Sequence, residues 1–203
     1  MSKVMIIAGL AKRIPYHENT VYIGVDAGAY KCMQHKIPME CAIGDFDSID
    51  SIKKQELASY TQLICLPKHK DQTDSEAAIH FALERGYEEI ILFGGLGGRM
   101  DHMLANLYLM MYRDVNLTLM DENNKLYIRG KGTYEITNNY KYLSFLALEK
   151  SVITLSNVAY PLTKKEVLKS DIYTISNEII GDVAYLEIHE GSFLIIQSND
   201  ADG

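Results

Sequence analysis

Two closely spaced pairs of aspartates stand out in the first half of this sequence. The first pair lies in Gly44-Asp45-Phe46-Asp47-Ser48, where Asp45 and Asp47 are separated by one residue. In an extended segment this spacing points both carboxylates to the same side and turns Phe46 inward. Two like charges this close raise each other's pKa unless a cation lies between them. The segment therefore predicts a site for a hard divalent cation such as Mg²⁺ or, alternatively, a polar turn without a ligand.

The second pair, Asp71 and Asp74, stands where a helix is expected to begin. Thr73 and Glu76 have the spacing of a capping box, so helix capping alone explains these two residues. Asp71 and Asp74 then flank the cap, with Lys70 available to pair with a phosphate. The segment is compatible with a plain helix start and equally with a ligand site.

A glycine-rich turn follows at Gly94–Gly98, which has four glycines in five positions and continues into Arg99-Met100-Asp101-His102. Such a turn before a helix offers backbone N–H groups to an anion. It lacks the spacing of a Walker A loop or of a dinucleotide-binding fold. Arg99 can bind phosphate oxygens with its planar fork. Asp101 could cap the helix, bind a metal, or both, and His102 is expected to orient a partner by hydrogen bonding.

A further acid, Asp26, follows an apolar run in Val25-Asp26-Ala27-Gly28. Taken alone, Asp26 is best explained as a helix-capping residue. Gly28 allows a ligand or a neighbouring backbone to approach closely.

Short apolar runs alternate with helical segments up to residue 121, which predicts a doubly wound, mostly parallel sheet with helices on both faces. The expected strands are Val4–Leu10, Val21–Val25, Cys41–Ile43, Gln62–Leu66, Ile90–Phe93 and Leu117–Met120, and the expected helices are Ala29–Gln34, Ser51–Ser59, Asp74–Arg85 and Asp101–Tyr112. The acidic segments follow the strands, at the carboxyl edge where open α/β sheets bind ligands. Together they predict a site for Mg²⁺ and nucleotide phosphates.

From residue 122 the pattern changes to strand-like runs rich in Tyr and Ile, which predicts an all-β sandwich over 122–203 after an α/β domain over 1–121. The expected strands are Thr133–Thr137, Tyr142–Ala147, Val152–Leu155, Tyr173–Ile175, Val183–Ile188 and Phe193–Gln197, with a helical turn at Lys164–Leu168.

Composition excludes several classes of protein. The net charge of -7 and the absence of a clustered Lys/Arg run argue against a nucleic-acid surface. The three cysteines form no C-x-x-C pair, which fits a reducing compartment. The run Val4–Leu10 is too short for a membrane span of roughly 20 residues and lacks a signal-peptide cleavage motif. We therefore expect a cytoplasmic protein without membrane contact.

An ordered set of motifs resembles the thiamin pyrophosphokinase family. These motifs are Asp26-Ala27-Gly28-Ala29, Gly44-Asp45-Phe46-Asp47-Ser48, Asp71-Gln72-Thr73-Asp74, Gly95 to His102 with Leu104 and Asn106, Tyr160-Pro161-Leu162 and Ile175-Ser176-Asn177-Glu178. The resemblance covers nearly the whole chain, and an ordered set is far more specific than any one of its members.

The resemblance implies an α/β domain followed by a β-sandwich, and a homodimer in which thiamin lies between the first domain of one subunit and the sandwich of the other. It implies that the acidic groups for Mg²⁺ and catalysis are Asp45, Asp47, Asp71, Asp74 and Asp101. ATP contacts are expected at Asp26, Gly28, Lys70, Thr73, Gly95, Gly97, Gly98, Arg99 and His102. Thiamin contacts are expected at Thr174, Ser176 and Asn177.

The implied reaction is attack of the thiamin hydroxyl on the β-phosphorus of ATP, which gives thiamin diphosphate and AMP. Two alternatives stay open. The first is another Mg²⁺-dependent phosphotransferase or phosphohydrolase in which one acid of the Asp45/Asp47 pair is a covalent nucleophile. The second is a nucleotide sensor that binds ATP without turnover.

Overall fold

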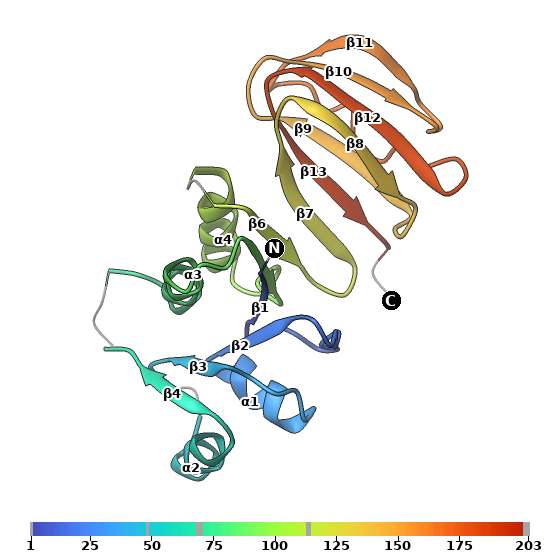
Figure 1. Ribbon diagram of the computed structural model, residues 1–203. Helices are drawn as coiled ribbons and strands as arrows, with labels where there is room; N and C mark the ends of the chain where they lie inside the picture. The colour runs from blue at the N-terminus through green and yellow to red at the C-terminus, as the bar shows by residue number, and fades with distance from the viewer. Residues whose placement is uncertain (1, 48, 68–70, 113–114, 201–203) are drawn as a thin grey trace. The chain divides into compact units, whose positions relative to one another are not determined.

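The computed structural model describes residues 2–47, 49–67, 71–112 and 115–200. The chain forms two compact units, Met1–Glu122 and Asn123–Gly203. The first contains helices and a parallel sheet, and the second contains antiparallel strands (Figure 1). The predicted combination of a doubly wound α/β domain and an all-β sandwich is therefore confirmed. No helix in the described ranges is long and apolar enough to cross a bilayer.

The sheet of the first unit is parallel throughout and has the strand order β4-β3-β2-β1-β5-β6. Its strands are β1 (Lys3–Ile7), β2 (Val21–Val25), β3 (Cys41–Gly44), β4 (Gln62–Cys65), β5 (Glu89–Phe93) and β6 (Leu117–Met120). The strand order reverses between β1 and β5, because β2 to β4 extend to one side of β1 whereas β5 and β6 lie on the other. Ligands of open α/β sheets bind at such a switch point.

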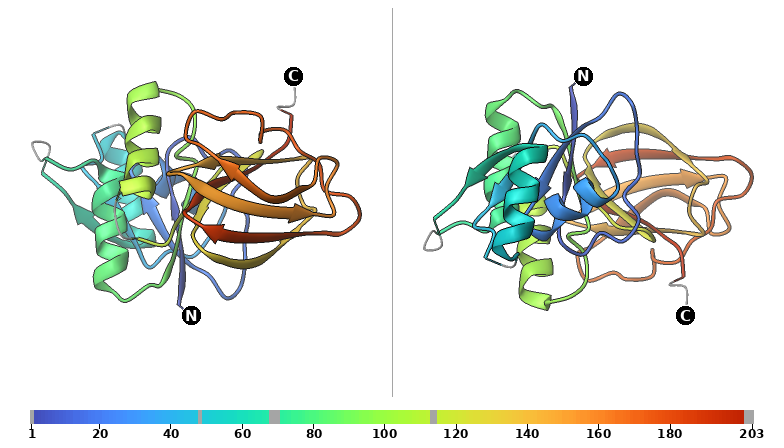
Figure 2. Two further views of the ribbon diagram at one scale, coloured as in Figure 1. Left: turned by 90° about the horizontal axis from the view of Figure 1, so that it is seen from above. Right: turned by 90° about the horizontal axis from the view of Figure 1, so that it is seen from below.

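Four helices cover this sheet. They are α1 (Ala27–Gln34), α2 (Ser51–Tyr60), α3 (Asp74–Glu84) and α4 (Met100–Tyr112). Helices α1 and α2 lie on one face of the sheet, and α3 and α4 on the other (Figure 1 and Figure 2). The Thr73 hydroxyl accepts a hydrogen bond from the Glu76 N–H at 3.1 Å, so Thr73 caps α3 as its sequence spacing predicts.

Buried aliphatic and aromatic side chains fix these layers. One cluster joins β1, β2 and β5 with α1 through Met5, Ile7, Tyr22, Cys32, Ile91 and Phe93, among others. A second cluster joins α1, β3 and α2 through Ala29, Ala42, Phe46 and Leu57. The carboxyl ends of the strands are thereby held in fixed positions beneath the loops that carry the acidic residues.

The first strand is shorter than predicted. It ends at Ile7 instead of Leu10, and the chain then turns across the sheet edge. The Ala8 N–H donates to the Phe93 carbonyl and the Leu10 N–H to the Gly94 carbonyl, at 2.8 and 3.3 Å. The segment after β1 therefore lies against the glycine-rich turn that follows β5.

The second unit packs two antiparallel sheets around one core. One sheet has the order β7-β13-β9 and the other β11-β10-β12-β8. Its strands are β7 (Asn124–Arg129), β8 (Gly132–Thr137), β9 (Tyr142–Ala147), β10 (Ser151–Ser156), β11 (Leu162–Val167), β12 (Val183–Glu190) and β13 (Phe193–Ser198). The core includes Tyr127, Ile136, Phe145, Ile153, Leu186 and Phe193.

Three local predictions for this unit are wrong. Lys164–Leu168 is not a helical turn, because most of it belongs to strand β11, whose irregular pairing with β10 includes a bond from the Lys164 N–H to the Thr154 hydroxyl. Tyr173–Ile175 is not a strand, because the chain turns there and Ser176 has a φ of 57°. Strand β7 was not predicted, because Lys125 and Arg129 interrupt its apolar pattern and leave two buried residues, Leu126 and Tyr127.

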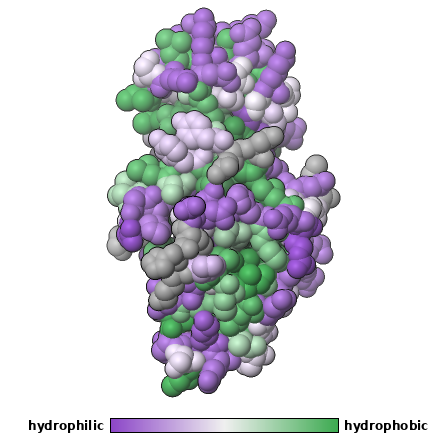
Figure 3. Space-filling view, turned by 90° about the vertical axis from the view of Figure 1, so that its left-hand side faces the viewer, coloured by the Kyte–Doolittle hydropathy of each residue, from purple (hydrophilic) through white to green (hydrophobic). Residues whose placement is uncertain are grey.

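Helix α4 leaves an apolar row of side chains at the surface. Met100, Leu104, Tyr108 and Tyr112 recur every four residues, and each is exposed by 47% or more. Side chains at this spacing share one face of a helix. Figure 3 shows that hydrophobic and hydrophilic residues are interspersed on the side of the protein it presents.

Candidate active site

A cavity of about 450 Å³ opens at the switch point between β1 and β5. Its walls come from the segments that follow β1, β2 and β5 and from the starts of α3 and α4. It is lined by Ala8, Gly9, Leu10, Val25, Asp26, Ala27, Thr73, Asp74, Ser75, Gly94, Gly95, Gly97, Arg99, His102 and Asn106. The glycine turn, Asp26 and the start of α3, which are far apart in the sequence, therefore face one cavity.

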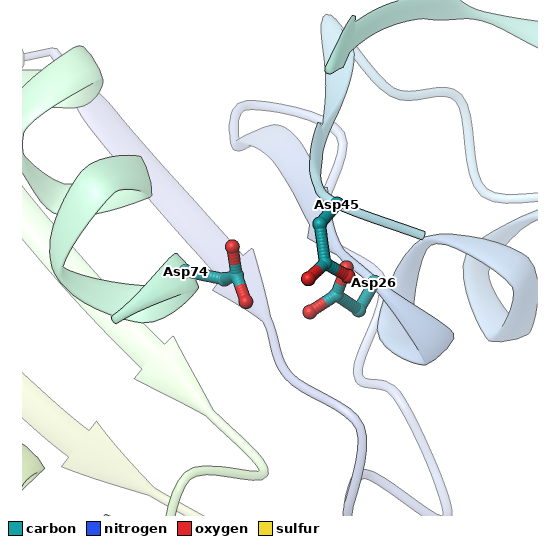
Figure 4. A group of neighbouring side chains, drawn as sticks. All are labelled: Asp26, Asp45 and Asp74. Carbon is teal, nitrogen blue, oxygen red and sulfur yellow. The ribbon is translucent and has the colours of Figure 1, made fainter. Parts of the chain in front are cut away.

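Three carboxylates converge at this edge of the sheet. Asp26, Asp45 and Asp74 each offer an oxygen within 4.8 Å of the others, and all three are half-buried (Figure 4). Asp26 follows β2, Asp45 follows β3, and Asp74 is the first residue of α3. The parallel sheet thus brings together acids from three loops at the carboxyl ends of its strands.

The backbone at Asp26 and Phe46 directs these acids toward one another. Asp26 precedes α1 but makes no side-chain cap bond, so the interpretation of Asp26 as a helix-capping acid is wrong. Its carboxylate instead accepts a hydrogen bond from the Phe46 N–H at 3.2 Å. Phe46 is buried, as expected, but has a φ of 55°. At Gly44, an added Cβ would lie 1.9 Å from the Asp26 Oδ1, so a side chain there would displace Asp26.

Burial and the neighbouring carboxylates both disfavour the charged form of Asp26. Burial, followed by the charge and hydrogen bond of Asp74 and the charge of Asp45, raises the Asp26 pKa to about 7. Half-buried carboxylates that repel one another are stabilised by a shared cation. Their oxygens are the ligand type that Mg²⁺ prefers. The donor set therefore fits a hard divalent cation.

Three of the predicted acids lie outside this group. Asp47, Asp71 and Asp101 are exposed. The Asp47 N–H donates to the Asp45 Oδ1 at 3.0 Å, so the segment is also a polar turn. Among the acids that the structure describes, the convergent group consists of Asp26, Asp45 and Asp74. Lys70 and Ser48 lie outside the described residues.

The glycine turn has a backbone that a side chain would disturb. Gly94 has a φ of 77°, and a Cβ there would lie 2.4 Å from the Ala11 nitrogen. The buried Asn106 of α4 donates from Nδ2 to the Gly95 carbonyl at 2.8 Å. Glycine is required at position 28 for a different reason, because an added Cβ there would lie 2.1 Å from the Ile7 carbonyl oxygen. That position requires glycine because α1 packs closely against β1.

Arg99 forms a two-pronged pair with Asp101. Its Nε and Nη2 donate to the two carboxylate oxygens at 3.1 and 2.6 Å. The hydrogen bond from Arg99 is the main reason that the Asp101 pKa falls to about 2. Asp101 also accepts from the His102 N–H at 3.0 Å. The guanidinium is exposed beside the cavity. Its two N–H donors bind both oxygens of the planar Asp101 carboxylate, which is the geometry that a phosphate group would also offer.

Two charged residues that sequence reasoning missed hold the segment after β1. The Lys31 ammonium group donates to the carbonyls of Gly9 and Ala11 at 2.6 and 2.8 Å. The Glu122 carboxylate accepts from the N–H groups of Lys12 and Arg13 at 2.7 and 2.9 Å. No local motif indicated these roles, because each depends on residues about 20 or 110 positions away. Together they fix one wall of the cavity.

In the second unit, two of the predicted thiamin contacts are occupied by internal bonds. The Thr174 hydroxyl is buried and donates to the Phe145 carbonyl. The Asn177 amide accepts from the Tyr160 N–H at 3.0 Å and donates to the Tyr160 carbonyl at 2.9 Å. Ser176 is exposed between them. Thr174 and Asn177 thus shape a loop that presents Ser176, and the thiamin contacts stay a prediction.

Comparison with known proteins gives matches in both units. Residues 15–120 match the family model described as thiamin pyrophosphokinase, catalytic domain, and residues 133–192 match the model described as thiamin pyrophosphokinase, vitamin B1 binding domain. The chain is 32% identical over 215 residues to the thiamine pyrophosphokinase of Bacillus subtilis, which covers 98% of this chain and 100% of the relative.

Solved structures agree with these matches. The crystal structure of the Bacillus subtilis thiamine pyrophosphokinase has a TM-score of 0.87 at 30% identity, covering 98% of this chain and 100% of that chain. A thiamin pyrophosphokinase family protein from Enterococcus faecalis has a TM-score of 0.86 at 29% identity, with the same coverage of both chains. The thiamin pyrophosphokinase from Candida albicans shares the fold at 15% identity and a TM-score of 0.75.

Proposed function

Because this chain belongs to the thiamin pyrophosphokinase family, we propose that it transfers a pyrophosphoryl group from ATP to the hydroxyl of thiamin, giving AMP and thiamin diphosphate. The observation that carries the proposal is the shared cavity at the switch point. There the glycine turn, Arg99 and the carboxylates of Asp26 and Asp74 lie together. Anion-binding and cation-binding groups in one cavity suit a nucleotide with its divalent cation.

Asp26, Asp45 and Asp74 would hold Mg²⁺, which when bound neutralises charge on the phosphates of the nucleotide. The fit rests on the convergence of their oxygens and on the raised pKa of Asp26, which burial causes first and the neighbouring carboxylates of Asp74 and Asp45 increase. The predicted participation of Asp47, Asp71 and Asp101 stays part of the proposal.

The remaining roles belong to the residues around the cavity. The N–H groups of the glycine turn and the Arg99 fork would bind phosphate oxygens and stabilise charge that develops as AMP leaves. Asp71 or Asp74, at the start of α3, would orient the thiamin hydroxyl and accept its proton. The acidic edge also attracts thiamin, since thiamin is a cation. Catalysis of this kind is mostly positioning and charge neutralisation.

The decisive experiment is incubation of the purified protein with ATP, Mg²⁺ and thiamin, followed by separation of the products. AMP and thiamin diphosphate in equal amounts are expected. Release of inorganic phosphate with a phospho-enzyme would favour a phosphohydrolase that uses the Asp45/Asp47 pair. ATP binding without any product would favour a sensor, and either result would overturn the proposal.

Lys31→Met is expected to raise the KM for ATP about tenfold with a smaller change in kcat. The reason is that hydrogen bonds from a charged donor contribute about 1.5–3 kcal/mol each, and Lys31 makes two of them to the segment that forms a cavity wall. Steady-state kinetics would measure the effect. Lys31→Arg should restore part of the affinity, and Lys53→Met on α2, which removes an exposed ion pair, should change neither constant.

We also propose that the active form is a homodimer, as the family resemblance implies. The apolar row on α4 supports this, because Leu104, Tyr108 and Tyr112 line a groove of about 570 Å³ that also includes Thr73 and Asp101. Solvent-exposed apolar rows of this kind mark interaction surfaces. A second copy seated there would lie next to the candidate active site.

Tyr108→Arg is therefore expected to convert the dimer to monomer and to remove most of the activity. Tyr108 is 60% exposed, so the change places a charge in the interface without disturbing the core. Light scattering coupled to gel filtration would measure the mass. Tyr185→Arg on β12, where the tyrosine is 48% exposed, is the matched control and should leave mass and activity unchanged. A dimeric Tyr108→Arg variant would contradict the assignment of α4 to the interface.

A further inference from the structure

Asn106 carries an unused hydrogen-bond acceptor at the switch-point cavity. The residue lies in the second turn of α4 and is only 6% exposed. It lines this cavity, and it does not line the groove along the outer face of α4. None of the roles proposed above uses its side-chain oxygen, so the chemistry of that oxygen is still to be explained.

The glycine turn fixes the orientation of the Asn106 amide. Its Nδ2 donates to the Gly95 carbonyl at 2.8 Å. A carbonyl oxygen can only accept, so the nitrogen of the amide must face Gly95 and Oδ1 must point elsewhere. The approach is close, because a Cβ added at Gly95 would lie 2.9 Å from the Asn106 Nδ2. The contact with the backbone therefore decides which way the amide is turned.

The Oδ1 of Asn106 has no donor within the part of the chain that the structure describes. The bond from Nδ2 to Gly95 is the hydrogen bond that this side chain makes there. Among the same residues, no side-chain oxygen or nitrogen is both completely buried and without a partner. Oδ1 is therefore accessible, and the cavity that Asn106 lines is where a ligand can reach it.

An acceptor at this position suits one part of a nucleotide and not the other. Phosphate oxygens accept hydrogen bonds, so they fit the N–H groups of the glycine turn and the Arg99 fork but not the Asn106 Oδ1. The donors of ATP are the ribose hydroxyls and the amino group of adenine. The three convergent carboxylates come from the segments after β2 and β3 and from the start of α3, whereas Asn106 belongs to α4. The nucleoside therefore fits Oδ1 better than the phosphates do.

We propose that the Asn106 Oδ1 accepts a hydrogen bond from the nucleoside part of ATP, either from a ribose hydroxyl or from the adenine amino group. Asn106 thereby determines part of the specificity for the nucleotide. A site that binds such a group rejects an analogue without it, because the buried acceptor is then left unpaired. The inference rests on the proposed function in one respect, which is that ATP enters this cavity, and it does not require turnover.

The test is a calorimetric titration of the full-length protein with nucleotides, in Mg²⁺ and without thiamin. ATP is compared with purine riboside triphosphate, which lacks the amino group, with 2′-deoxy-ATP and 3′-deoxy-ATP, which each lack one hydroxyl, and with tripolyphosphate. One of the three nucleotide analogues should bind the wild type about tenfold more weakly than ATP, and it identifies the donor. In Asn106→Leu, this analogue and ATP should differ by less than about twofold, because the acceptor is gone.

A merely structural role of Asn106 would give a different result. If the amide only supports Gly95, Asn106→Leu should weaken ATP, the analogues and tripolyphosphate by the same factor. An unchanged ratio between ATP and each analogue would therefore overturn the inference, as would a change confined to thiamin binding. If the wild type binds no ATP, the proposed function and this inference are both wrong. If it binds ATP with the expected ratios but forms no AMP, only the proposed reaction is wrong.

Two further variants complete the test. Asn106→Ser is too short to make either contact and avoids the bulk of leucine, so it should show the same loss of discrimination if Asn106→Leu does not fold. Asn116→Leu is the matched control. The Asn116 Nδ2 donates to the Glu88 carbonyl at 3.3 Å, before β5 and β6 and thus at the opposite ends of the strands from the cavity. Its affinities for ATP and for each analogue should equal those of the wild type.

Discussion

Asp74→Asn should remove turnover while making the metal-free protein more stable. Asn keeps the volume of the side chain but removes one of three converging charges, so the group loses affinity for Mg²⁺. The expected loss in kcat is about 1,000-fold, the size found when a group that stabilises transition-state charge is removed. In EDTA at pH 8, relief of repulsion should raise the Tm by about 2–4 °C, which corresponds to about 1 kcal/mol in a chain of this size.

The pH dependence of the Tm tests the same three carboxylates independently. The Asp26 pKa is raised from 3.8 to about 7, mainly by burial and then by Asp74. A raised pKa means that the folded state binds the proton more tightly than the unfolded state, so this contribution to stability is complete below about pH 4 and is lost as the pH rises to about 7. The Tm of the metal-free wild type should therefore fall as the pH rises from about 4 to about 7, and the Tm of Asp74→Asn should fall less. Stabilisation by added Mg²⁺ should grow over the same range.

Asp50→Asn is the matched control for Asp74→Asn. Asp50 also stands at a helix start, where it accepts from the Lys53 N–H at 2.8 Å, but it does not belong to the convergent group. Asn is an equally good capping residue, so activity and the effect of Mg²⁺ on the Tm should be unchanged. If Asp74→Asn kept normal turnover, or if Mg²⁺ stabilised it as much as wild type, the assignment of these carboxylates to the metal would be wrong.

The sequence predicted the edge of the sheet that carries the site better than it predicted the arrangement of the acids. Apolar runs followed by Asp26 and Asp45 located that edge, because parallel strands place their carboxyl ends together. The prediction that Asp26 caps a helix is wrong, because its carboxylate binds a group far away in the sequence. The Phe46 N–H, 20 residues away, provides a bond to Asp26 in place of the helix start.

Specific hydrogen bonds, one local and one long-range, explain two other wrong predictions. The extended geometry assumed for the Asp45/Asp47 pair does not hold, since Phe46 adopts a positive φ and the Asp45 carboxylate binds the Asp47 N–H. Tyr173–Ile175 has the composition of a strand, but the buried hydroxyl of Thr174 bonds to Phe145 and the chain turns. Propensity and spacing report on average local preference. A local side-chain bond overrides that preference at Asp45, and a tertiary hydrogen bond overrides it at Thr174.

Arg99→Lys should lower kcat about 100-fold while changing the KM for thiamin little. The reason is the geometry of the guanidinium, which is visible in its pair with Asp101. There Nε and Nη2 donate to the two oxygens of one carboxylate. A phosphate offers the same two-oxygen geometry, and lysine keeps the charge but cannot reproduce the fork. The loss should fall on kcat because charge on the phosphate oxygens changes most as the transition state forms.

Steady-state kinetics with ATP and thiamin varied separately would measure this split. Arg85→Lys is the matched control, because Arg85 pairs with Glu40 beyond the opposite end of α3 and should affect stability only slightly. Asp101→Asn provides the second half of a double-mutant cycle. Because Arg99 pairs with Asp101, Asp101→Asn should change the KM for ATP more in the Arg99 protein than in the Arg99→Lys protein. A change confined to the KM for thiamin would mean that Arg99 and the glycine turn bind thiamin instead of the phosphates.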